Sequence, residues 1–426
     1  MDGRIVREDV TSNLEASEVT AATMATVMQS LLRRGVSTRA EIVNDTGLSR
    51  PTVSRTLATL LRDGTIEQVK DPNHVGRGRP VHLVGISSRR ANTVGVELGR
   101  RHIAFAVADL SGRVVFSATR DTNAALSLLD RAREALAFMI AQTEDAGVDL
   151  TRLRNVVVGT PGPRYRNPEN HKTSDVSLAR LSRERTLVAK VFTTSLRAPV
   201  SVGNNTRYTA LAEIGRRRAA GLSVDNLIYL RVDEGVGGGI VAGGELQTGA
   251  WDAAGEMGHI SLDLNGAPCF CGGRGCLELV AALPAVILAA GAADLDDLRD
   301  LATRDPAAAT AIHDAATATA QAIAGVLAVA NPSVLVIGGS VASLPGFMDR
   351  FETVTRATAP LWATLDLVIE AAATDHLLGA IGAAAAGHGV VEGSTPFAGE
   401  HVTPSIKESQ KTTAQKTTAG SPVGRR

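Results

Sequence analysis

All three cysteines of this 426-residue chain lie within eight residues of one another, at Cys269, Cys271 and Cys276. Such a short loop cannot supply the dispersed, even-numbered cysteines of a secreted disulfide framework. With His259 they form the pattern His-x9-Cys-x-Cys-x4-Cys, and thiolates with one imidazole suit tetrahedral Zn²⁺. Four protein ligands leave no position for a catalytic water. The sequence therefore predicts a structural zinc site at His259, Cys269, Cys271 and Cys276.

The alternative interpretation of this loop is three small buried residues beside a hydrogen-bonded core histidine. The use of every cysteine of the chain in one loop favours the metal. Gly272, Gly273 and Gly275 are expected to let the loop bend enough for the three sulfurs to converge.

Length and composition predict a globular protein of two or three domains, since 44% of the residues are hydrophobic and 21% charged. The longest apolar stretch, 281–293, contains Pro284 and falls short of the roughly 18 residues that span a bilayer. The first ten residues mix both charge signs, where a secretory signal has an apolar core. We therefore expect a cytoplasmic protein without membrane insertion.

Residues 20–88 carry the pattern of three helices followed by a β-ribbon. Apolar residues recur at helical spacing from Met24 to Leu32. A second helix is expected over 37–45 with Ser37 as its N-cap, and a third after Ser49. Two β-like segments, 65–69 and 81–84, are joined by a loop rich in Pro, Gly and Asn. This order predicts a winged helix-turn-helix.

This segment is basic although the whole chain has no net charge: residues 29–90 hold eleven Lys and Arg against five Asp and Glu. The N-terminal residues of a recognition helix read the major groove, and arginines of a wing neutralise phosphates or enter the minor groove. The alternative is a solvated charged hairpin. We predict that the following residues contact double-stranded DNA: Ser49, Arg50, Thr52, Ser54, Arg55, Arg77 and Arg79.

Beyond residue 91 strand-like and helix-like segments alternate in two rounds, the second beginning at Leu227. Each round starts with a β-meander, which predicts an α/β protein of two lobes. Large apolar residues become scarce after residue 391, so we expect a disordered tail there.

The order of these motifs resembles the transcriptional regulators of the ROK family (repressors, open reading frames, kinases). The specific element is ExGH-x9-CxCGxxGCxE, and further matches are GTPGP at 159–163, NN at 204–205, GVGGG at 235–239 and NPSVLVIGGS at 331–340. The resemblance implies a winged helix-turn-helix followed by an actin-like, ribonuclease H-like domain of the sugar-kinase type. We divide the chain into a flexible N-terminus (1–17), a DNA-binding domain (18–88), a ROK domain (89–391, zinc loop 259–276) and a tail (392–426).

In that family a sugar binds in the cleft between the lobes. The resemblance implies effector contacts at Asn204, Asn205, Glu256, His259 and Glu278. Carboxylates and amides are suited to adjacent sugar hydroxyls, and a zinc on one nitrogen of His259 leaves the other as a donor. The alternative is that Glu256 and Glu278 are surface acids.

Three departures from the family's kinases bear on catalysis. Asn205 stands where the kinases have the aspartate base, and an amide cannot accept the proton of the sugar hydroxyl. Residues 97–101 read ELGRR where a D-x-G-x-T phosphate loop is expected. Glu234 replaces a threonine, and its carboxylate would repel a triphosphate. These departures predict a protein that is not a working kinase.

The sequence thus favours a sugar-responsive regulator, a repressor of genes for carbohydrate uptake or catabolism, that binds an inverted-repeat operator as a homodimer or homotetramer. One alternative is a bifunctional kinase and regulator. Another is a regulator controlled by a protein partner, because residues 167–181 lack the tryptophan that the resemblance leads us to expect in a sugar-contact loop.

Overall fold

The computed structural model describes residues 22–69, 83–87, 91–162, 176–250, 253–373 and 376–388. Four predicted segments lie wholly or mostly outside the described residues: the flexible N-terminus (1–17), the loop that holds Arg77 and Arg79, residues 167–181 and the tail (392–426).

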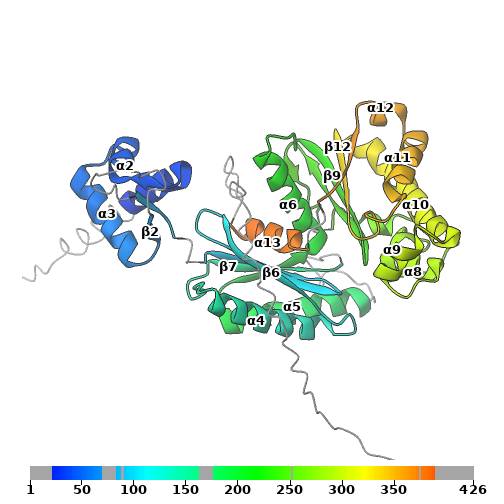
Figure 1. Cartoon of the computed structure of the whole chain (residues 1–426), viewed down its shortest axis with the longest axis horizontal. Coiled ribbons are helices and arrows are strands. Elements are labelled where there is room, and N and C mark those ends of the chain that lie inside the picture. The colour runs from blue at the N-terminus through cyan, green and yellow to red at the C-terminus, as the bar shows by residue number, and fades with distance from the viewer. Residues whose placement is uncertain are drawn as a thin grey trace, which may run out of the picture.

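The N-terminal domain consists of three helices and a small antiparallel sheet (Figure 1). A helix over 22–34 precedes α2 (Arg39–Thr46) and α3 (Arg50–Arg62). The strands β1 (Ser37–Thr38), β3 (Leu83–Ile86) and β2 (Ile66–Val69) follow one another in that order across the sheet. Apolar side chains from all three helices and two strands form the core: Val27, Leu31, Ile42, Val53, Leu57, Leu60, Ile66 and Val84. A winged helix-turn-helix is therefore confirmed.

Two local expectations in this domain were wrong. Thr38, not Ser37, is the N-cap of α2, because Glu41 stands three residues after it and completes a capping box. The Thr38 backbone N–H donates to Glu41 at 2.7 Å, and the Glu41 N–H donates to the Thr38 hydroxyl at 3.2 Å. The second ribbon strand continues to Ile86, which pairs with Ile66, beyond the predicted end at residue 84; residues 81 and 82 lie outside the described ranges. Ser49 does cap α3, accepting from the Thr52 N–H at 3.3 Å.

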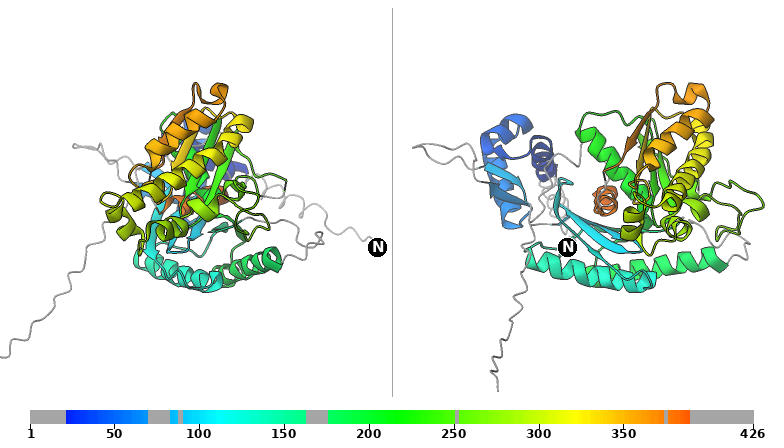
Figure 2. Two further views of the ribbon diagram at one scale, coloured as in Figure 1. Left: turned by 90° about the vertical axis from the view of Figure 1, so that its right-hand side faces the viewer. Right: turned by 45° about the vertical axis from the view of Figure 1, so that its right-hand side comes forward.

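The first lobe of the larger domain is a five-stranded sheet in the order β6-β5-β4-β7-β8. Its meander is β4 (Thr93–Leu98), β5 (His102–Ala108) and β6 (Val114–Asp121), and β7 (Asn155–Thr160) and β8 (Val200–Asn204) continue it in parallel. Helices α4 (Leu128–Asp145) and α5 (Val176–Leu196) lie side by side along the sheet (Figure 2).

The second lobe repeats this topology with the sheet order β11-β10-β9-β12-β13. Its strands are β9 (Asn226–Val232), β10 (Val236–Ala242), β11 (Glu245–Leu246), β12 (Val334–Gly338) and β13 (Val368–Ala371). The helical layer comprises α7 (Glu278–Ala281), α8 (Leu283–Ala290), α9 (Leu295–Leu301), α10 (Pro306–Ala330), α11 (Phe347–Thr358) and α12 (Leu361–Thr364). The duplicated strand order confirms the predicted two-lobed, actin-like α/β fold.

Helix α10 is long and apolar enough to cross a membrane, by length and composition alone. The same test is passed by core helices of soluble proteins, and Ala316, Ile323 and Leu327 of α10 are fully buried against the second sheet and α11. We therefore describe it as a core helix of this lobe.

Two helices join the lobes. Helix α6 (Asn205–Ala219) contacts strands of both sheets, and α13 (Leu378–His388) packs against α6 and against β4, β5 and β7 (Figure 1). Close approach is possible because α13 is built from small residues: a Cβ at Gly382 would stand 1.7 Å from the Tyr208 carbonyl oxygen. The end of β8, which precedes α6, and the loop that follows β9 therefore meet between the lobes.

Candidate functional site

The N-terminal half of α3 presents basic side chains. Arg50 and Arg55 are exposed, and neither has an ion-pair partner among the described residues. The hydroxyls of Ser49 and Thr52 lie 2.8 Å apart, so these two predicted DNA contacts also fix the start of the helix. Ser54 is half-buried. Arg77 and Arg79 cannot be placed, because they lie outside the described residues.

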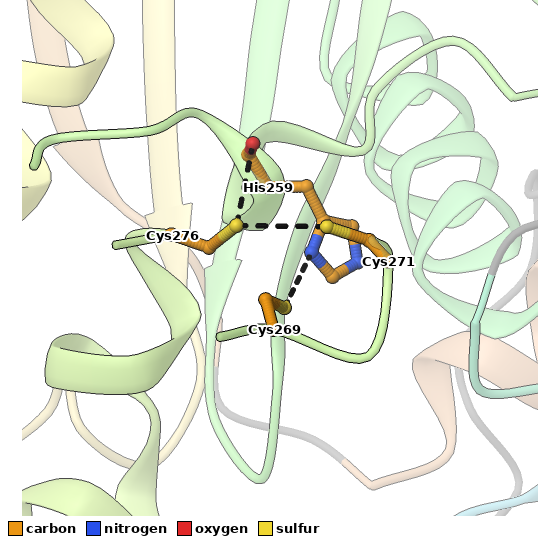
Figure 3. Close-up of side chains that lie close together, drawn as sticks. All are labelled: His259, Cys269, Cys271 and Cys276. Atoms are coloured by element: carbon orange, nitrogen blue, oxygen red, sulfur yellow. Dashed lines mark hydrogen bonds between the residues drawn. The ribbon is translucent and has the colours of Figure 1, made fainter. Parts of the chain in front are cut away.

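The predicted zinc ligands converge in one place, as Figure 3 shows. The ligand atoms of His259, Cys269, Cys271 and Cys276 all lie within 4.8 Å of one another. The Cys271 and Cys276 sulfurs are 3.6 Å apart, and the Cys269 sulfur is 3.6 Å from His259 Nδ1. Tetrahedral zinc with Zn–S bonds of about 2.3 Å spaces its sulfurs by about 3.8 Å. The cluster therefore fits a metal ion of this kind.

The loop reaches this geometry through two bridges and one glycine. Isolated β-bridges join Ser261 to Cys276 and Pro268 to Arg274. Gly275 has a φ of +58°, and a Cβ there would stand 2.0 Å from the Asp263 carbonyl oxygen. The backbone N–H of Gly273 donates to the Cys271 sulfur at 3.4 Å. A side chain at 275 would therefore displace the turn that carries Cys276.

A cavity of about 1090 Å³ opens between the lobes and is lined by all five predicted effector residues. Asn204 ends β8, Asn205 begins α6, Glu256 precedes the short helix Met257–His259, and Glu278 begins α7. The Asn204 amide donates to Glu256 Oε1 at 3.0 Å and to the Gly162 carbonyl at 3.1 Å. Glu278 accepts from the Val236 N–H at 3.1 Å. The residues that the sequence predicted for the cleft are thus brought together.

Two further features shape this wall of the cleft. Burial raises the pKa of Glu256 to about 7, and Glu278 adds to the rise, although Arg207 and Arg185 oppose it. His259 directs Nδ1 toward Cys269, which leaves Nε2 as its second ring nitrogen. Phe270 meets the His259 ring edge-on with centroids 4.9 Å apart.

A network of ion pairs lies in the wall of the cleft at the predicted phosphate loops. Glu97 is 1% exposed and its Oε1 lies 2.8 Å from Arg231 Nη1. The Asn205 amide donates to the same oxygen at 3.2 Å. Burial alone would raise the pKa of Glu97, but Arg231 and His102 lower it to about 2. Glu97 is therefore a buried carboxylate whose charge depends on Arg231.

The network continues into the second loop. Arg231 also contacts Asp233 at 3.0 Å, and Asp233 accepts from the Ser340 hydroxyl at 2.6 Å. Arg101 lies 2.7 Å from Glu234. Sequence reasoning missed Arg231 and Asp233. A detectable signal was present, because two charged residues interrupt the apolar strand just before the glycine loop.

Residues 93–389 match the ROK family model. This span is more than half of the chain. The chain belongs to the ROK family. Residues 22–67 match the model of the RNA polymerase III subunit RPC82 helix-turn-helix domain, in agreement with the fold of the N-terminal domain.

Similar proteins include both regulators and kinases. The xylose repressor of Bacillus subtilis (strain 168) is 27% identical over 273 residues, 61% of this chain and 66% of the repressor. The N-acetylmannosamine kinase of Escherichia coli O139:H28 is 37% identical over 166 residues, 38% of this chain and 56% of the kinase. The chain thus aligns with less than two thirds of the length of either relative.

Among solved structures, a ROK family transcriptional regulator described as a homologue of the E. coli MLC protein superposes with a TM-score of 0.58 at 22% identity. The match covers 86% of this chain and 95% of that one. This likeness shows the shared fold.

Proposed function

We propose that this ROK protein is a transcriptional repressor whose affinity for an inverted-repeat operator is lowered by a sugar or sugar derivative bound between the lobes. The observation that carries the proposal is the convergence of Asn204, Glu256, His259 and Glu278 on one cavity. A polyol requires such a set of acceptors and donors on adjacent hydroxyls. The similarity to a xylose repressor supports the same class of effector.

The DNA-binding part of the proposal rests on the N-terminal winged helix-turn-helix domain (18–88), called the head below. Arg50 and Arg55 stand exposed near the start of α3, where a recognition helix meets base edges. An inverted repeat requires two such heads, so we propose a homodimer or a homotetramer as the active form.

We further propose that the cleft does not transfer phosphate. Asn205 cannot serve as a general base, and its amide is already held by Glu97. The carboxylates of Glu97 and Glu234, paired with Arg231 and Arg101, stand in the loops that would hold nucleotide phosphates. The alternative is a protein that is both a sugar kinase and a regulator, and the similarity to N-acetylmannosamine kinases favours it.

We propose Zn²⁺ as the ion of the Cys3His cluster, in a structural role. Bound at Nδ1 of His259, zinc would leave Nε2 protonated as a hydrogen-bond donor. His259 lines the cleft, so its ring is then fixed for one orientation of the effector. The loop links Glu256 to Glu278, and its order therefore affects both carboxylates.

Sugar binding can change operator affinity only if the free and the DNA-bound protein bind the sugar with different affinities. The sugar can lower operator affinity by the ratio of its affinities for free and DNA-bound protein, about 5- to 150-fold in typical cases. Closure of the lobes around the sugar would change the spacing of the two heads, which must grip half-sites about one helical turn apart.

The test is an operator titration with and without sugars such as xylose and N-acetylmannosamine, together with calorimetry of sugar binding. Glu256→Ala should abolish both sugar binding and operator release. Glu245→Ala is the matched control, since Glu245 is exposed on β11 and outside the cavity lining. If Glu256→Ala left both unchanged, the cleft would not be the sensor and control by a protein partner would replace this proposal. Sugar-dependent ATP turnover would favour the kinase instead.

A further inference from the structure

Arg131 is a buried arginine in the wall of the cleft. It belongs to α4, is 8% exposed and lines the cavity. Its Nη1 donates to the Gly99 carbonyl, and its Nε has no hydrogen-bond partner among the described residues. A buried guanidinium usually has a carboxylate partner, because an unpaired buried charge is costly. Within the described part of the chain, Arg131 has no ion pair.

A second arginine adds to this charge. Arg100 follows Gly99, is exposed, lines the same cavity and has no ion pair within the described ranges. Burial and the charge of Arg100 lower the pKa of Arg131, whereas Glu184 raises it. Among the described carboxylates, Glu184 is the one whose charge raises the pKa of Arg131.

The other acids nearest the phosphate loops are already engaged. Asp233 is held by Arg231, and Glu234 by Arg101. They therefore add little net negative charge. Glu184 also lines the cavity and offsets part of the charge of Arg131, so Arg100 and Arg131 together leave this wall positive. A cavity of about 1090 Å³ slightly exceeds the usual range for small-molecule sites, about 300–1,000 Å³. A monosaccharide at Asn204 and Glu256 leaves room beside it.

We propose that Arg131 and Arg100 form an anion subsite of the effector cleft and that the effector is a sugar phosphate. This inference rests on the proposed function and specifies its ligand. Guanidinium forks match phosphate oxygens in geometry and charge, and the phosphate supplies acceptors for the unsatisfied donors of Arg131. The subsite binds a phosphate that the sugar already carries, so no bond is made or broken.

The test is calorimetry on the full chain with matched ligands: glucose and glucose 6-phosphate, N-acetylmannosamine and its 6-phosphate, xylose and its 5-phosphate, and inorganic phosphate alone. At least one phosphorylated sugar should bind more tightly than its parent, by about tenfold or more, as expected for charge-assisted hydrogen bonds. Arg131→Met and Arg100→Ala should each remove most of that preference and leave the affinity for the parent sugar unchanged.

Arg133→Met is the matched control. Arg133 lies on the same helix, but it is exposed, pairs with Asp130 at 2.9 Å and does not line the cleft. This variant should keep the full preference for phosphate. Arg100→Ala removes an exposed side chain, so it remains informative if Arg131→Met fails to fold.

Three results would overturn the inference: parent sugars that bind as tightly as their phosphates, an undiminished preference in Arg100→Ala, or inorganic phosphate that binds as tightly as any sugar phosphate. In the first two cases sugar binding, and with it the proposed function, survives. Gluconate is added to the ligand set as a carboxylate sugar. If gluconate bound more tightly than every sugar phosphate, the anion of the subsite would be a carboxylate and the assignment of phosphate would be wrong. If no sugar of either kind binds, the proposed function fails together with the subsite.

Discussion

At the scale of single residues, the Glu97 carboxylate is the group most dependent on its neighbours. It is almost fully buried, and Arg231 and His102 keep it charged against the effect of burial. Such a pair contributes little to stability compared with an apolar pair of the same shape, but the loss of one partner leaves an isolated buried charge. The contact also joins β4 of one lobe to β9 of the other.

We predict that Arg231→Met lowers the free energy of unfolding by about 3–5 kcal/mol, as for other broken buried ion pairs. The double variant Glu97→Gln, Arg231→Met should regain part of the loss. Urea denaturation measures both. Arg299→Ala serves as control, because its pair with Asp296 is exposed and should be worth less than about 1 kcal/mol. A single variant as stable as wild type would show that Glu97 is not held by Arg231.

Glu256 differs from Glu97 because its pKa is raised, and this makes stability depend on pH. Its folded-state pKa of about 7 lies above the ordinary value of 4.5. Between these two values the unfolded chain has released the proton and the folded chain has kept it, so this group makes stability fall as pH rises. Glu256→Gln imitates the protonated form at every pH. We predict that the Gln variant gains stability relative to wild type between pH 5 and pH 8 in urea denaturation. Parallel pH profiles would contradict the raised pKa.

At the scale of elements, much could be predicted because the signals are local. The cap at Ser49, the apolar stripe of α3 and the Cys3His loop follow from spacing along the chain. The cap of α2 was misplaced by one residue, since Ser37 and Thr38 are both good caps and only the position of Glu41 decides between them. The Arg231 network was missed because its partners come from strands more than 100 positions apart.

The zinc loop allows a direct test at this scale. We predict about one zinc per subunit in the freshly purified protein, and its loss in Cys271→Ser, because three ligands hold zinc far less tightly than four. Elemental analysis gives the metal content, and hydrogen exchange of residues 256–278 should rise in the variant. Ser261→Ala, which removes a hydroxyl bond to the Arg274 carbonyl but no metal ligand, should keep the zinc. Protein purified without zinc would refute the assignment.

At the scale of the whole molecule, we expect the head to bind DNA and the ROK domain to bind the effector. Arg50→Ala or Arg55→Ala should weaken discrimination between operator and random sequence, since a base contact is worth about 1–3 kcal/mol. Arg77→Ala and Arg79→Ala should mainly reduce overall affinity and its salt dependence. Fluorescence anisotropy over a salt series measures both effects. Undiminished DNA binding after deletion of residues 1–90 would disprove the role of the head.

The two lobes together decide whether the cleft can act as a kinase. Phosphoryl transfer needs a base at the sugar hydroxyl and loops that accept the nucleotide phosphates from both lobes. Here Asn205 and Glu97 of one lobe and Arg231 of the other are bound to one another where those groups would act. Opening this site for a triphosphate would expose or unpair Glu97. The cost of that step opposes nucleotide binding before any chemistry begins.

We therefore predict no sugar phosphorylation above background with ATP, for hexoses or N-acetylhexosamines, in a coupled assay. Asn205→Asp alone should not restore activity, because the new carboxylate would face the buried charge of Glu97, while Asp233 and Glu234 still stand in the second loop. Repulsion between two buried carboxylates should also raise the pKa of one of them, and a carboxyl that stays protonated cannot accept the sugar proton. Robust turnover by the unmodified protein would show that the ion pairs open readily, and the chain would then be a kinase that also binds DNA.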